Sequence, residues 1–185
     1  MDVLIISSSR NEIDDYYKSI ARHLSNYLAN NDCNLTFGGA STSMMGICYE
    51  EFSKRNRNIY TYTTPKYIED LKKLPNSKQI ICETTFDLKK RMFENSDLIL
   101  CLPGGIGTIS ELLSYIEEKR SNNSDIPIII YDENNYYKKL FNMIDETVIN
   151  NFSDNSIYNM FDIVTTKEEF EDLFIEKRGK LKWII

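Results

Sequence analysis

Histidine is nearly absent from this sequence, since His23 is the only one among 185 residues. Ser-His-Asp catalysis, Cys-His catalysis and histidine-rich metal sites would all have to use that one side chain. His23 lies within a helical pattern that includes Ile20, Leu24 and Leu28, so we interpret it as a residue on a helix surface or at the edge of the core. Any catalysis must then come from carboxylates, cations, hydroxyls or backbone amides.

Cysteine is also scarce and no CxxC pair occurs, which argues against a zinc site or a disulfide framework. Long apolar runs are missing as well, because none reaches the roughly 18 residues that span a bilayer. The first apolar run, Val3–Ile6, is short and has no basic lead-in of the kind that export signals carry. We therefore expect a cytoplasmic protein without a membrane partner, in which most of the four thiols are reduced and buried: Cys33, Cys48, Cys82 and Cys101.

The charge balance excludes a further class of partner. The formal net charge is -6, so a broad surface for nucleic acid or an anionic membrane is not expected. An anionic ligand would have to be held by a local cluster of donors. The 42% hydrophobic and 27% charged residues are typical of a globular protein, and the length fits one domain over residues 1–185.

Short apolar runs alternate with amphipathic helical stretches along the chain, which predicts βαβ units and a parallel sheet. The runs 98–102 and 126–131 are apolar without alternation, as strands covered by helices on both faces must be. We therefore predict an α/β fold, a doubly wound parallel sheet with helices on both faces. The predicted strands are 3–7, 34–38, 58–64, 79–84, 98–102, 126–131 and 163–165. The predicted helices are 16–30, 44–56, 87–96, 108–119, 136–150 and 167–177, with a short helix or loop at 66–74.

Ligands of such sheets bind beyond the carboxyl ends of the strands. The most informative loop there is PGGIGT at residues 103–108, followed by Glu111. Three glycines between a buried strand and a helix allow positive φ and close approach of a ligand, and the helix N-terminus favours a phosphate. The alternative is a capping box, with Thr108 as N-cap and Glu111 returning to its amide. A cap needs no glycine loop, so we favour the phosphate site.

Three other loops reach the same edge of the predicted sheet. Residues 37–46, FGGASTSMMG, form a small-residue turn that serves either helix packing or a ligand. Lys89, Lys90 and Arg91 lie near a helix start, where cations oppose the helix dipole, so they indicate either a nearby anion or a solvated basic face. Residues 7–10, SSSR, supply hydroxyls for a sugar or base, or form an exposed polar turn.

Residues 103–108 with Glu111 resemble the PGGxGTxxE motif of the LOG (Lonely Guy) family. Those proteins are cytokinin riboside 5'-monophosphate phosphoribohydrolases, often misnamed lysine decarboxylases. Residues 37–46 are similar to the family's YGGGxxGLMG, and residues 135–137, NYY, to its GYY. The resemblance spans nearly the whole chain. It implies a Rossmann-like fold, a homodimer, and release of a free base and ribose 5-phosphate from a nucleoside monophosphate, with no metal or redox cofactor.

The resemblance also implies roles for individual residues. Glu111 is the expected catalytic carboxylate, with Lys89 or Arg91 as the assisting cation. Where the family has MxxRKxxM, Lys89 matches the lysine but Leu88 stands at the arginine position, and Ser43 replaces a glycine of GLMG. The expected substrate-binding residues are Ser8, Ser9, Gly38, Gly39, Met45, Gly46, Gly104, Gly105, Gly107 and Thr108.

These features leave three alternative functions to compare. The first is an N-glycosidase that acts on AMP-like or N6-substituted adenine monophosphates through Glu111. The second is a nucleotide sensor or carrier without catalysis, which the loss of the arginine at Leu88 favours. The third is a purely structural domain, against which the glycine loop argues. A pyridoxal phosphate decarboxylase is not expected, because no convincing site for that cofactor is present.

Overall fold

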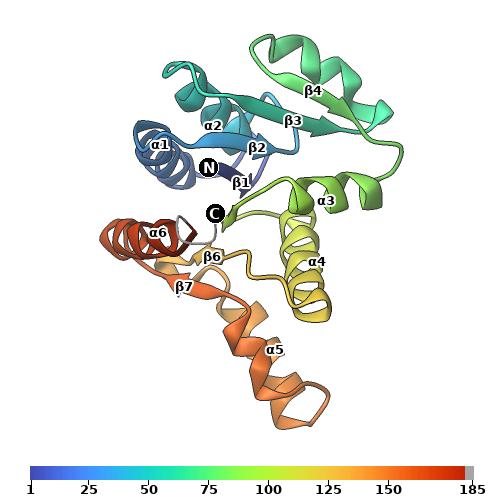
Figure 1. Ribbon diagram of the computed structural model, residues 1–185, viewed down its shortest axis with the longest axis vertical. Helices are drawn as coiled ribbons and strands as arrows, with labels where there is room; N and C mark the ends of the chain where they lie inside the picture. Colours follow the sequence, from blue (N-terminus) through green and yellow to red (C-terminus); the bar gives the residue numbers. More distant parts are fainter. Residues whose placement is uncertain (182–185) are drawn as a thin grey trace.

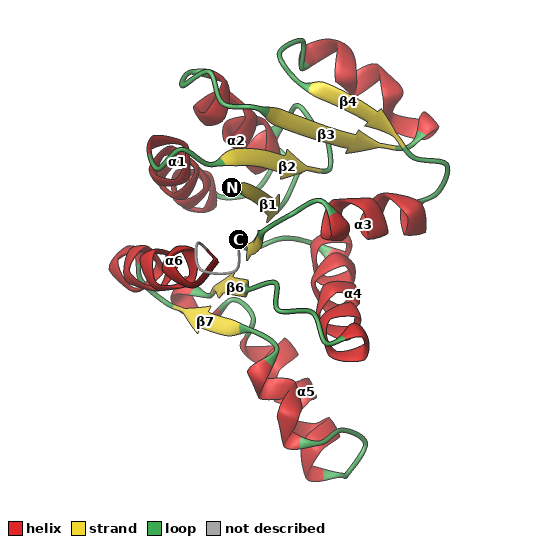
Figure 2. Ribbon diagram, in the orientation of Figure 1, coloured by secondary structure: helices red, strands yellow, loops and turns green. Residues whose placement is uncertain are grey.

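The computed structural model describes residues 1–181 as a seven-stranded, wholly parallel sheet with helices on both faces (Figure 1). Figure 2 shows the sheet in yellow between two layers of helices. The strand order is β4-β3-β2-β1-β5-β6-β7. The predicted doubly wound α/β fold is confirmed.

The elements follow one another in strict alternation. The strands are β1 (Asp2–Ile6), β2 (Asn34–Phe37), β3 (Ile59–Thr63), β4 (Lys78–Ile81), β5 (Leu98–Cys101), β6 (Ile128–Tyr131) and β7 (Asp162–Val164). The helices are α1 (Asp15–Asn30), α2 (Ser43–Ser53), α3 (Thr85–Glu94), α4 (Ile106–Asn122), α5 (Lys138–Ile149) and α6 (Lys167–Leu181). Short 3-10 helices are η1 (Pro65–Lys73), η2 (Glu133–Asn135) and η3 (Asn155–Asn159).

The two faces of the sheet carry two separate cores, because successive side chains of a strand point to opposite faces. In β1, Val3 and Ile5 join the core beneath α1, α2 and α6, whereas Leu4 joins the core beneath α3 and α4. All four residues of β5 are buried. Both faces of the central strands are therefore covered, which is why these runs are apolar without alternation.

The strand order reverses between β1 and β5, which are paired in the middle of the sheet. The chain moves outward from β1 to β4 on one side and from β5 to β7 on the other. Doubly wound sheets bind ligands at such a switch point, beyond the carboxyl ends of the strands. The fold therefore brings the loops after β1 and β5 to the same place.

Some predicted boundaries are wrong. The helix predicted from residue 108 begins at Ile106, with Gly105 as its N-cap. The helix predicted from residue 136 begins at Lys138, after a turn in which Asn134 has a φ of 63°. The predicted burial of the thiols is confirmed, since all four cysteines are buried and free. Within residues 1–181, no helix has the length and apolar character needed to cross a bilayer.

Candidate functional site

The loop after β5 leaves backbone donors free at the start of a long helix. The first hydrogen bond of α4 runs from the amide of Ile109 to the carbonyl of Gly105. The amides of Ile106, Gly107 and Thr108 precede it and have no acceptor among residues 1–181. These N–H groups and the partial positive charge of a 17-residue helix form a favourable position for a single anionic group.

One glycine of this loop, Gly104, is needed for space, and none of the three has an unusual dihedral angle. A Cβ on Gly104 would lie 2.2 Å from Oγ1 of Thr108, whereas Cβ atoms on Gly105 and Gly107 would meet nothing within 4 Å. Gly39 is the one glycine in the described part of the chain with positive φ, so the expectation of positive φ in this loop is wrong. Gly104 allows the loop to pack on Thr108, and the space around Gly105 and Gly107 is open.

Thr108 is buried within the first turn of α4, and its hydroxyl donates to the carbonyl of Ser7 at 3.1 Å. The alternative of a capping box is excluded, because the helix begins two residues earlier with Gly105 as N-cap. The Thr108 side chain therefore joins the loop to the end of β1, and its backbone amide faces the anion position. Ser7 is also buried there, and its Oγ has no hydrogen-bond partner in the described residues.

Two tyrosine hydroxyls donate hydrogen bonds to backbone carbonyls at the glycine loop. Tyr136 Oη donates to the carbonyl of Gly104 at 2.8 Å, and Tyr137 Oη donates to the carbonyl of Leu102 at 2.7 Å. Asp132 accepts the Tyr137 amide at 2.6 Å. The carbonyls of Leu102 and Gly104 are therefore both hydrogen-bonded. The sequence offered only the NYY pattern as a signal, and it did not reveal this supporting role.

Glu111 is the carboxylate beside these amides. It lies on the second turn of α4, because the helix begins at Ile106. The predicted helix start at residue 108 would have placed it on the first turn. It lines a mostly apolar cavity of about 320 Å³, and burial raises its pKa to about 7, against an opposing effect of Lys89. The other lining residues are Gly38, Met45, Thr63, Thr64, Tyr67, Thr85, Leu88, Lys89, Gly107 and Ser110.

The cations of α3 are divided between two cavities. Lys89 lines the Glu111 cavity, and its ammonium donates to Oγ of Ser110 at 2.7 Å and to Oγ of Ser114 at 3.2 Å. Leu88, at the arginine position of the motif, lines the same cavity. The cation that reaches this side is therefore held by serines of α4, and an aliphatic side chain stands beside Glu111.

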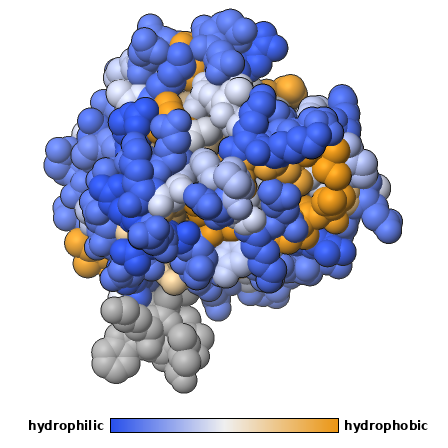
Figure 3. All heavy atoms as spheres, turned by 90° about the horizontal axis from the view of Figure 1, so that it is seen from above, coloured by the Kyte–Doolittle hydropathy of each residue, from blue (hydrophilic) through white to orange (hydrophobic). Residues whose placement is uncertain are grey.

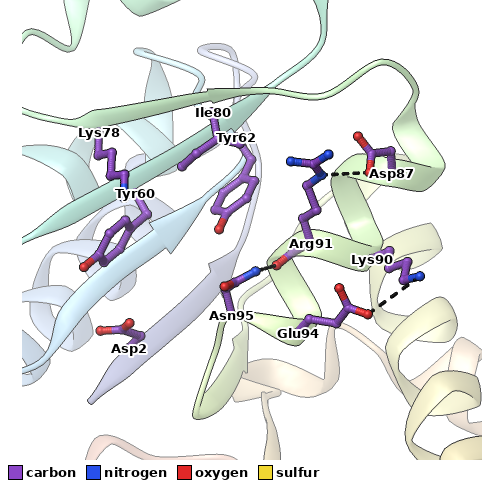
Figure 4. A pocket seen from close by; sticks show the side chains of 10 residues that line it. All are labelled: Asp2, Tyr60, Tyr62, Lys78, Ile80, Asp87, Lys90, Arg91, Glu94 and Asn95. Carbon is purple, nitrogen blue, oxygen red and sulfur yellow. Dashed lines mark hydrogen bonds and ion pairs between the residues drawn. The ribbon is translucent and has the colours of Figure 1, made fainter.

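Arg91 and Lys90 line a different cavity, of about 650 Å³, between α3 and the sheet (Figure 4). Arg91 Nε pairs with Asp87 at 2.8 Å. Positions 89 and 91 differ by about 200° around a helix, so they cannot face one cavity. The structure thus contradicts the expectation that Arg91 assists Glu111.

The loop after β2 and the first turn of α2 contribute two of their four expected residues to the cavity. Gly38 and Met45 line it. Gly39 has a φ of +75°, and a Cβ on Gly46 would lie 2.6 Å from the carbonyl oxygen of Ser41. Gly39 and Gly46 therefore shape the turn and are not among the residues that line the cavity. The two proposed roles of this loop, turn and ligand contact, fall on different residues.

Ser8 and Ser9 are not among the residues that line the cavity. The carbonyl of Ser8 accepts the Met45 amide at 3.3 Å, and the carbonyl of Ser9 accepts the Thr42 hydroxyl at 2.8 Å. They connect the loop after β1 to the start of α2. Sequence reasoning missed Thr63 at the end of β3, Thr64 at the N-cap of η1 and Tyr67 within η1, since no local motif marks them.

The fold and this site define a class: a Rossmann-like α/β protein with an open amide loop for an anion and a carboxylate beside it. A family model described as "Possible lysine decarboxylase" matches residues 38–173. The chain belongs to this family, the LOG family, as the motif resemblance predicted. Within residues 1–181, no group of three His, Cys, Asp or Glu side chains is placed to hold a metal ion.

Relatives of known name agree with that assignment. The chain is 28% identical over 155 residues to cytokinin riboside 5'-monophosphate phosphoribohydrolase LOG1 of Arabidopsis thaliana, covering 79% of this chain and 68% of LOG1. It is 27% identical over 183 residues to LOG7 of the same plant, covering 90% of this chain and 81% of LOG7.

Among solved structures, the molybdenum cofactor carrier protein of Chlamydomonas reinhardtii is similar in fold, with a TM-score of 0.70 at 11% identity over 96% of this chain and 98% of that chain. The molybdenum cofactor binding protein of Rippkaea orientalis has a TM-score of 0.59 at 15% identity over 95% and 94% of the two chains.

Proposed function

We propose that this protein hydrolyses the N-glycosidic bond of a purine nucleoside 5'-monophosphate, either AMP-like or of cytokinin type. The products are the free base and ribose 5-phosphate. The observation that carries the proposal is the placement of a half-buried carboxylate and free amides on one helix. Glu111 follows Ile106 by five residues, or about 7.5 Å along the axis, a separation suited to a ribose between its 5'-phosphate and C1'.

Each part of the cavity has a role in this reaction. The amides of residues 106–108 bind the phosphate, and the apolar side chains of Met45, Tyr67 and Leu88 contact the base. As the bond from C1' to the base nitrogen breaks, positive charge develops on the sugar, and an ionised Glu111 stabilises it. Water adds its hydroxyl to C1', and the remaining proton ends on the departing base. Lys89 assists by favouring the ionised form of Glu111.

The experiment that tests this proposal is incubation of the protein with a panel of nucleoside 5'-monophosphates, scored by chromatography for free base. Glu111→Gln should abolish release while nucleotide affinity stays nearly unchanged. Glu118→Gln is the matched control, because Glu118 is exposed on the same helix and accepts only from Asn122. Base release by the Glu111→Gln variant at the wild-type rate would show that the assigned role is wrong.

A second function is favoured by one observation. Leu88 occupies the arginine position and lines the cavity without charge, which suits a carrier or sensor that binds a nucleotide without cleaving it. The fold is shared with proteins named as molybdenum cofactor carriers. Thermal stabilisation by nucleotides together with no release of base from any of them would select this second function.

We also propose that the protein is a homodimer, as the family resemblance implies. Phe86 in the first turn of α3 and Ile106 at the start of α4 are 81% and 83% exposed. Figure 3 shows apolar side chains gathered on the right of the view. Burial of such side chains by a second copy is favourable. The double variant Phe86→Asp and Ile106→Asp should run as a monomer in light scattering at a concentration where the wild type is a dimer.

A further inference from the structure

Tyr115 is a buried phenol for which the core alone gives no reason. Its side chain is 1% exposed and stacks on Phe93 of α3, with ring centroids 5.7 Å apart and an interplanar angle of 26°. Its Oη is buried and has no hydrogen-bond partner among residues 1–181. Burial of a hydroxyl without a partner is unfavourable, and phenylalanine would fill the same space without that penalty. We therefore expect a hydrogen-bond acceptor near the Tyr115 hydroxyl.

Glu111 precedes Tyr115 by one helical turn on α4, so the two side chains lie on the same face of the helix. The Glu111 carboxylate accepts no hydrogen bond from any described residue. Burial and, to a smaller extent, the nearby negative charge of Glu111 raise the pKa of Tyr115. The buried phenol and the half-buried carboxylate are thus neighbours on one helix face, and neither has a hydrogen-bond partner among residues 1–181.

The other titratable groups around Glu111 are not equivalent donors. Lys89 of α3 is hydrogen-bonded to Ser110 and Ser114. Cys101 of β5 is buried, and burial with the charge of Glu111 raises its pKa to about 12. Tyr67 of η1 lines the cavity and is half-exposed. Tyr115 is the group that combines an unused O–H donor, a fixed ring and the adjacent turn of the same helix.

We propose that Tyr115 is a positioning residue whose hydroxyl donates a hydrogen bond to the ionised carboxylate of Glu111. A side-chain rotation of Glu111 toward the core brings the pair together, while Phe93 holds the phenol ring in place. The bond stabilises the charged form of Glu111 and orients its second oxygen toward the cavity. The catalytic consequence rests on the proposed hydrolase function, but the hydrogen bond itself does not.

The pairing is tested first without substrate, by an NMR titration of the Glu111 side-chain carboxyl in protein carrying 13C-labelled glutamate. The signal is assigned by its loss in Glu111→Gln. Tyr115→Phe should raise the pKa of Glu111 by about one, because a hydrogen bond to a charged group is lost. Tyr27→Phe is the control, since Tyr27 packs against Phe170 and Phe174 on the opposite face of the sheet.

A graded series separates a hydrogen bond from a packing effect. Site-specific 3-fluorotyrosine at position 115 is a stronger donor of nearly the same shape, so it should lower the pKa of Glu111 below the wild-type value. If Tyr115→Phe leaves that pKa unchanged, or if the fluorinated residue shifts it in the same direction as phenylalanine, the pairing is disproved.

The role in catalysis is measured separately. With a nucleotide that the wild type cleaves, Tyr115→Phe should lower kcat about tenfold, leave KM within twofold, and move the acidic limb of the pH profile upward by the same amount as the titration. If no nucleotide is cleaved while the titration behaves as expected, the proposed function fails and the pairing of Tyr115 with Glu111 stands. An unchanged pH profile in a cleaving enzyme would show that Tyr115 is only structural.

Discussion

Replacing Glu111 with glutamine should make the folded protein more stable at alkaline pH and leave its stability unchanged at acidic pH. Burial raises the pKa of Glu111 from its ordinary value of 4.5 to about 7. Between these two values the folded protein keeps a proton that the unfolded chain has released, so the free energy of unfolding falls as pH rises. Glutamine does not titrate, and the variant therefore escapes this loss.

The size of the effect follows from the same two values. A difference of one pKa unit corresponds to about 1.4 kcal/mol, so the shift of Glu111 sets an upper bound of roughly 3.4 kcal/mol. The carboxyl is only half-buried, and partial solvation on ionising reduces the expected gain to about 2 kcal/mol at pH 8. For a chain of this length, that gain raises Tm by roughly 4–8 °C.

The assay is urea denaturation of wild type and variant at pH 4.5 and at pH 8, with Glu118→Gln as the control on the same helix. The difference in unfolding free energy should be near zero at pH 4.5 and reach its full value above pH 7. An equal difference at both values would mean that the effect comes from packing rather than from ionisation. A variant less stable than the wild type at pH 8 would refute the burial argument for Glu111.

Leu88→Arg should raise the rate of base release by about 10²-fold, measured on the best nucleotide of the panel, because it adds a preorganised cation to the cavity wall; an unchanged rate would show that the missing arginine does not limit the reaction. Ser43→Gly should raise the unfolding free energy by about 0.5–1 kcal/mol in urea, since Ser43 has a φ of 54° that favours glycine, and a loss of stability would contradict this. Gly104→Ala should destabilise by about 1–3 kcal/mol, because its Cβ would overlap Thr108. Gly105→Ala should change the free energy of unfolding by less than about 0.5 kcal/mol, because its Cβ would meet nothing within 4 Å. Equal melting points for the two alanine variants would show that the proposed packing of Gly104 alone against Thr108 is wrong.

The sequence predicted the fold because each level of its pattern agreed with the others. The apolar runs at 98–102 and 126–131 required cover on both faces, and the structure places them as β5 and β6, two interior strands of the sheet. Alternation of strands with helices then required parallel pairing. Residues 103–108 and Glu111 could be located by the same reasoning, because a glycine loop between strand and helix must lie at the carboxyl edge.

Prediction was weaker where the outcome depended on the direction of a side chain. Lys89 and Arg91 are two residues apart, yet one lines the Glu111 cavity and the other pairs with Asp87 beside a second cavity. The predicted start of the fourth helix at residue 108 was wrong, because the helix begins at Ile106 with Gly105 as N-cap. No local sequence motif predicts either outcome.

The sequence by itself determined which segments form strands and helices, where the glycine loop lies and which carboxylate follows it, because these depend on periodicity and on backbone freedom over a few neighbouring residues. The tertiary structure alone decided which donors remain free, which tyrosines hold the loop carbonyls, and how burial raises the pKa of Glu111. Those properties depend on contacts between residues far apart in the chain, such as Tyr136 with Gly104. Only the packed sheet brings such partners together and removes water from around them.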